Sequence, residues 1–151
     1  MEEQSEKEKQ SREYFKNGYN CAQSVLFVFY EECGLDRVSA LKLSSSFGGG
    51  MGRLREVCGA VSAMFMVAGL KYGYFENNND EKKAEHYKLI QDLAEKFRKE
   101  NGSIICRELL GEDKDGYIPS KRTEEYYAAR PCEKLIASAV RIFEEYEKTR
   151  K

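Results

Sequence analysis

One apolar segment constrains the fold of this chain more than any other feature. It runs from Val57 to Leu70, 14 residues in which Ser62 is the only polar side chain. A membrane-spanning helix needs about 20 such residues, so this segment is too short to cross a bilayer. It has to be covered by the rest of the chain, and the sequence predicts a central buried helix over about residues 54–72.

The surrounding sequence favours helices throughout. The chain has only two prolines in 151 residues and shows no clear run of alternating apolar and polar positions. We therefore predict an all-α fold, a multi-helix bundle that forms one domain over residues 1–151. The expected helices, besides the central one, cover residues 5–16, 21–33, 39–45, 80–100, 103–111 and 131–148, and residues 112–119 are expected to form a polar loop.

Charge and composition exclude several classes of function. The 25 basic and 26 acidic side chains nearly cancel, which argues against a nucleic-acid or anionic-lipid partner. The first ten residues are charged and lack the apolar core of a secretory signal. We expect a cytoplasmic protein without membrane insertion, with amphipathic helix faces that leave room for a homodimer.

Four of the five cysteines fall at predicted helix starts. The unpaired N–H groups of a helix start favour negative charge, so this placement predicts thiols that lose their protons easily. The fifth cysteine, Cys33, precedes Gly34 at a predicted helix end and is set apart. The four candidates for catalysis or metal binding are Cys21, Cys58, Cys106 and Cys132.

The spacing of these four cysteines gives less information. They are separated by 37, 48 and 26 residues, so no pair forms the Cys-x-x-Cys motif of zinc knuckles or thioredoxin-like proteins. Cysteines are also commonly small buried residues, which is the simpler explanation for any one of them. A shared site requires the bundle to bring them together, as helix bundles do for many metal and cofactor sites.

A glycine-rich loop, Gly48-Gly49-Gly50-Met51-Gly52, precedes the central helix. Its backbone N–H groups could approach an anion, a cluster or a thiolate, and Arg53 and Arg55 would add positive potential. Alternatively, the loop only makes a sharp turn. It does not match a Walker A motif. The candidate cofactor-binding residues are Gly48, Gly49, Gly50, Gly52 and Arg53.

The pattern resembles the redox-active protein family named for its Cys…Cys-Gly-Ala-x-x-Gly…Cys…Cys signature. The matching stretches are Gly18 to Ala22, Phe47 to Gly52, Glu56 to Ala60 and Gly69 to Gly73, with Cys106 and Cys132 as the last two cysteines. The last glycine of the signature is Ala63 here. The resemblance implies a redox role and does not supply a substrate.

Two classes of function follow. The leading hypothesis is a redox protein, possible oxidoreductase or electron-transfer component, whose four cysteines ligate an iron–sulfur cluster or form a dithiol/disulfide couple. Its partner would be a redox protein, a small thiol or an anion. The alternative is a helical interaction module with structural zinc or no metal. A thiol-dependent enzyme ranks last, because His86 is the only histidine and no general base pairs with Cys58.

Overall fold

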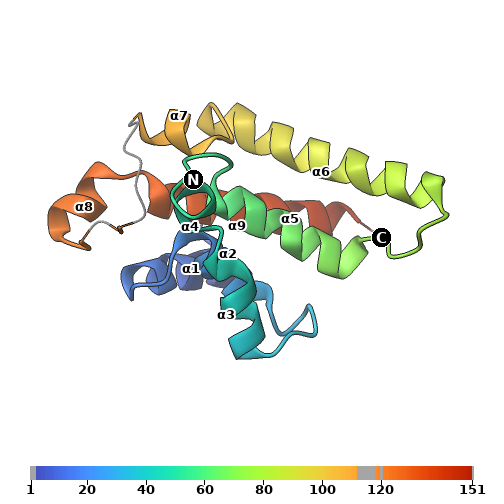
Figure 1. The fold of residues 1–151 in the computed structure, drawn as a ribbon, viewed down its shortest axis with the longest axis horizontal. Helices are drawn as coiled ribbons and strands as arrows, with labels where there is room; N and C mark the ends of the chain where they lie inside the picture. Colours follow the sequence, from blue (N-terminus) through green and yellow to red (C-terminus); the bar gives the residue numbers. More distant parts are fainter. Residues whose placement is uncertain (1–2, 112–117, 120, 151) are drawn as a thin grey trace.

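The computed structural model describes residues 3–111, 118–119 and 121–150, and in this part of the chain all named elements are helices. Figure 1 shows α6 lying along α5 and α9 on one side, with α1, α2 and α3 on the other side. The short helices α4, α7 and α8 lie at one end of this assembly. The elements are α1 (Glu6–Lys16), α2 (Cys21–Phe29), α3 (Arg37–Ser45), α4 (Gly48–Met51), α5 (Gly59–Tyr72), α6 (Asp80–Asn101), α7 (Cys106–Leu110), α8 (Glu124–Ala129) and α9 (Cys132–Thr149).

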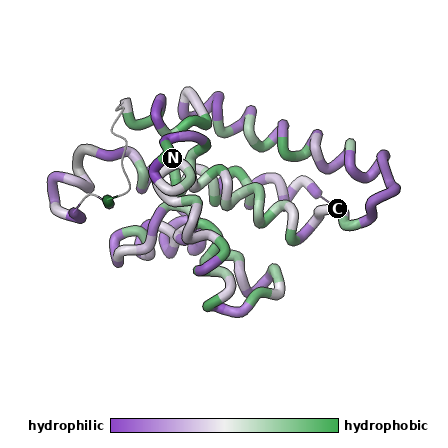
Figure 2. Tube along the Cα trace, in the orientation of Figure 1, coloured by the Kyte–Doolittle hydropathy of each residue, from purple (hydrophilic) through white to green (hydrophobic). Residues whose placement is uncertain are grey.

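Helix α5 lies at the centre of one hydrophobic core, as its sequence predicts. It packs most extensively against α2, and also against α6 and α9. Figure 2 shows that the trace of α5 is mostly apolar, whereas α6 carries hydrophilic residues along much of its length. The largest fully buried side chains include Phe29, Leu26, Met64, Leu93, Phe97, Ile136 and Phe143. The predicted all-α fold is therefore confirmed.

Local capping explains where several helices begin. Ser5 and Asn20 each form a capping box with the third residue of the following helix, Glu8 and Gln23. The side chain of Asn79 accepts from the backbone N–H of Lys82 and so caps the long amphipathic helix α6. These caps agree with the predicted starts of α1, α2 and α6 to within about one residue.

The central helix begins later than predicted. Residues 54–57 are not helical, because their backbone groups bond to another segment: the carbonyls of Arg55 and Glu56 accept from the N–H groups of Arg107 and Cys106 at 3.2 and 2.6 Å. The N–H of Cys58 also donates to the carbonyl of Ile104 at 2.8 Å. Val57 and Ile105 form an isolated antiparallel bridge. Helix α5 therefore starts at Gly59, with Cys58 as its N-cap residue.

Three further predictions differ from the structure. Helix α2 ends at Phe29, and Cys33 lies in the turn that follows. Ser103 does not cap α7; its hydroxyl accepts from the N–H of Ile105, and α7 begins at Cys106. Helix α8 was not predicted, because six residues without an apolar stripe give no periodic signal.

Two remaining expectations concern the loop at 112–119 and the membrane. Residues 112–117 of that loop lie outside the described residues. None of the helices in the described part of the chain is long and apolar enough to cross a membrane.

Candidate functional site

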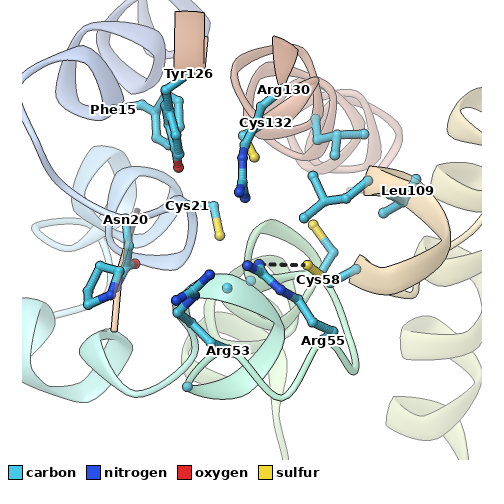
Figure 3. A pocket seen from close by; sticks show the side chains of 18 of the residues that line it. Phe15, Asn20, Cys21, Arg53, Arg55, Cys58, Leu109, Tyr126, Arg130 and Cys132 are labelled. Atoms are coloured by element: carbon cyan, nitrogen blue, oxygen red, sulfur yellow. Dashed lines mark hydrogen bonds between the residues drawn. The ribbon is translucent and has the colours of Figure 1, made fainter. Parts of the chain in front are cut away.

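All four helix-start cysteines line one pocket of about 270 Å³. Figure 3 shows Cys21, Cys58 and Cys132 around this space, with the side chains of Arg53, Arg55 and Arg130 extending toward it. Chain topology explains the gathering, because α2, α5, α7 and α9 all begin at the same end of the bundle (Figure 1). The other lining residues are Phe15, Asn20, Ser45, Gly48, Gly49, Gly52, Gly59, Leu109, Leu110, Pro119, Arg122, Tyr126 and Leu135.

Cys21 is the first residue of α2, and its sulfur lies against the start of α5. A Cβ atom added to Gly59 would lie 2.5 Å from Cys21 Sγ and 3.2 Å from the backbone nitrogen of Ala22. Real Cβ atoms essentially never come within 3.0 Å of such an atom, so the distance to the sulfur would force a shift. The glycine that follows Cys58 therefore lets two of the four cysteines approach each other across the contact between α2 and α5.

Cys58 and Cys106 are brought together by a short antiparallel pairing. Besides the Val57–Ile105 bridge, the N–H of Cys106 donates to the carbonyl of Glu56 at 2.6 Å. Successive side chains of extended backbone alternate between two faces. Cys58 and Cys106 each lie one residue from the bridge, in diagonal positions, and both line the pocket.

Cys132 reaches the pocket from α9. It is the first residue of this helix, and Pro131 is the N-cap residue. The following residues of the predicted stripe are buried in the core, among them Leu135, Ile136 and Phe143. The sulfur thus lies at the boundary between the core and the pocket.

The glycine-rich loop has an unusual left-handed backbone. Five consecutive residues, Gly49 to Arg53, have positive φ angles between 61° and 72°. Two of them, Met51 and Arg53, are not glycine, and each such residue costs roughly 1–2 kcal/mol. Strain of this kind often accompanies functional sites, and the role of the loop stays a prediction.

Arginine side chains give the pocket positive charge. Arg55 is buried, with 2% of its surface exposed, and its Nη1 donates to the sulfur of Cys106 at 3.8 Å. Burial lowers the pKa of Arg53, and the nearby charges of Arg55 and Arg130 lower it further. The guanidinium of Arg122 donates to the backbone carbonyls of Phe15 and Tyr19. Among the described residues that line the pocket there are four arginines and no aspartate or glutamate.

The predicted ease of proton loss is wrong for three of the cysteines. Burial raises the pKa of Cys21 and Cys58, and raises that of Cys132 to about 12. The N–H groups of Gly49 and Ala22 act in the opposite direction on Cys21, as do those of Ala60 and Val61 on Cys58. The N–H groups at the helix starts do stabilise the thiolates. The free-energy cost of removing a thiolate from water is larger than this stabilisation, so the pKa rises.

The remaining predicted residues fall into two groups. Gly48, Gly49, Gly52 and Arg53 line the pocket, whereas Gly50 is buried behind Cys106, whose Cβ would lie 2.6 Å from a Cβ added there. Cys33 and His86 do not line it. Sequence reasoning missed Arg122, Tyr126 and Arg130, because the helix α8 that positions the latter two gave no signal.

The donor groups determine which metal centres the pocket suits. Among the described residues, no three histidine, cysteine or carboxylate side chains lie close enough together to hold a single metal ion. A zinc ion would need its four thiolates at about 2.3 Å from one centre. The four thiols that line the pocket of about 270 Å³ are the side chains that could hold a metal centre.

Comparison with known proteins gives a family but no individual relative. The chain matches the family model described as "Putative redox-active protein (C_GCAxxG_C_C)" over residues 19–146, and it belongs to that family. No curated protein and no solved structure matches it significantly. The resemblance seen in the sequence is thereby confirmed, and the roles of the individual cysteines stay predictions.

Proposed function

We propose that this member of the redox-active family is an electron-transfer protein in which Cys21, Cys58, Cys106 and Cys132 ligate an iron–sulfur cluster. The observation that carries the proposal is the placement of all four cysteines around one arginine-lined pocket. Thiolates of cysteine are the usual ligands of such clusters, and four of them complete a common ligand set. When bound, the cluster would accept and release single electrons.

The protein's own residues suit this role through charge and solvent exclusion. An all-thiolate cluster carries net negative charge, which the guanidinium groups of Arg53, Arg55 and Arg130 would offset. Phe15, Leu109 and Leu135 contribute apolar surface to the pocket, and such surface limits the access of water to a buried centre. Because burial disfavours free thiolates at Cys21 and Cys58, metal binding would have to release their protons.

The test is anaerobic purification followed by iron, sulfide and zinc analysis. The wild-type protein is expected to contain iron and sulfide and to show visible absorption that bleaches on reduction. Each pocket cysteine replaced singly by serine should lose most of this absorption. Cys33→Ser is the matched control, because Cys33 is also a free, partly buried cysteine but lies outside the pocket. Zinc in place of iron, or equal loss in Cys33→Ser, would contradict the proposal.

A second candidate is favoured by the pairing of residues 55–58 with 104–107. It places Cys58 and Cys106 beside one pocket in diagonal positions, and because diagonal neighbours lie about 7–8 Å apart, a disulfide between them requires the two segments to shift. One thiolate would attack the disulfide of a small thiol compound or a partner protein and release one thiol. The other cysteine would then displace the second thiol, so that two electrons and two protons pass to the substrate.

This second candidate has its own measurement. Metal-free protein treated with glutathione disulfide should lose two hydrogen atoms in mass and yield a peptide linked through Cys58 and Cys106. A stable mixed disulfide on a single cysteine, with no linked peptide, would count against it.

A further inference from the structure

Arg55 makes a contact that the proposed function leaves unexplained. Its guanidinium is almost fully buried and donates to the sulfur of Cys106 at 3.8 Å. Sulfur is a weak acceptor when it is neutral and a strong one when it carries negative charge. The contact therefore becomes more favourable as negative charge on Cys106 increases.

The backbone holds Arg55 in this position from both sides. Its N–H donates to the carbonyl of Gly49 at 3.4 Å, and its carbonyl accepts from the N–H of Arg107 at 3.2 Å. Its φ angle is 62°, in the left-handed region that non-glycine residues rarely adopt. Gly50 leaves the space between Arg55 and Cys106, because a Cβ there would lie 2.9 Å from the Cα of Arg55.

We propose that Arg55 is a positioning residue that raises the reduction potential of the site through its hydrogen bond to Cys106. The inference rests on the proposed function, in which Cys106 is a cluster ligand. Reduction adds one negative charge to the cluster and its sulfur ligands. A buried positive donor stabilises the reduced form more than the oxidised form, so it raises the potential.

Arg53 makes a suitable comparison within the same pocket. It carries the same charge, and no hydrogen bond joins it to a sulfur among the described residues. Arg98 on α6 is a surface control of equal charge, with 47% of its side chain exposed and a salt bridge to Glu95. The two controls separate the sulfur contact from the general effect of positive charge.

The experiment measures the midpoint potential of the cluster-loaded protein by redox titration monitored by visible absorption. In Arg55→Gln we expect the ratio of reduced to oxidised protein at a fixed potential to fall about tenfold, equivalent to about 59 mV for one electron. Arg53→Gln should lower this ratio by about threefold or less, and Arg98→Gln should leave it unchanged. An Arg55→Gln potential equal to that of wild type, or a shift no larger than in Arg53→Gln, would overturn the inference.

If Arg55→Gln fails to fold or to bind the cluster, a second variant tests the same inference. Arg55→Lys keeps the charge but replaces the planar fork of donors with a single ammonium. The midpoint potential of this variant should therefore lie below that of wild type. A value equal to wild type would overturn the role of the sulfur contact. A wild-type protein that binds no cluster would instead overturn the proposed function, and the inference with it.

Discussion

Gly59 offers the most direct test of how the fold arranges the cysteines. In Gly59→Ala the added Cβ would lie 2.5 Å from Cys21 Sγ and 2.7 Å from the carbonyl oxygen of Phe47. Both distances are below 3.0 Å, so α2 and α5 have to separate or the Cys21 side chain has to move. Overpacking of this kind costs about 1–3 kcal/mol. We expect the free energy of unfolding to fall by that amount.

A second glycine of the same helix supplies the matched control. A Cβ added to Gly69 meets no atom within 4 Å, and its backbone is helical. Gly69→Ala should therefore gain about 0.4–1 kcal/mol, because alanine loses less conformational freedom on folding. The two substitutions are chemically identical, so the opposite signs would arise from their surroundings alone.

The assay is urea unfolding followed by far-ultraviolet circular dichroism, with thermal melts in parallel. For a chain of this size, 1 kcal/mol corresponds to about 2–4 °C in the melting temperature. Under the proposed function, the cluster content of Gly59→Ala should also fall, since the added Cβ displaces Cys21. Equal stability of Gly59→Ala and Gly69→Ala, with unchanged cluster content, would refute the argument that the signature glycine makes room for Cys21.

Three further predictions concern stability. Asn20→Ala should lower the free energy of unfolding by about 0.5–2 kcal/mol because it removes the capping box of α2, and Asn20→Ser, which retains a capping oxygen, should lose less in the same urea titration. Phe97→Ala should cost about 3–5 kcal/mol, because this ring of α6 is fully buried; a cost below 1 kcal/mol would mean that α6 is not part of the core. Burial alone raises the pKa of Glu32, but salt bridges to Lys7 and Lys71 at 2.6 and 2.7 Å outweigh it, so the net pKa is lowered. The stability that these salt bridges provide is present at pH values above the ordinary pKa of 4.5 and is lost as the pH falls through the folded-state pKa. Acid should therefore lower the free energy of unfolding of the wild type more steeply than that of Glu32→Gln. Parallel pH profiles for the two proteins would contradict this.

The sequence alone determined the helical character of the protein and the position of its core. A 14-residue apolar run in a strongly charged chain is stable only in the buried core. Local capping residues such as Ser5, Asn20 and Asn79 mark helix starts without contacts from the rest of the fold. The same local signals put four cysteines at helix starts. These inferences succeeded because each depends on residues a few positions apart.

Only the tertiary structure decided what those cysteines experience. Burial, which depends on helices distant in sequence, reverses the predicted direction of the pKa of Cys21, Cys58 and Cys132. The bond between residues 58 and 104 moves the start of α5, and no local pattern indicates such a long-range pairing. The position of Arg55 beside Cys106 has the same origin, since it needs a left-handed backbone and a partner 51 residues away. Solvent exclusion and long-range contacts are properties of the packed chain, so local sequence patterns do not predict them.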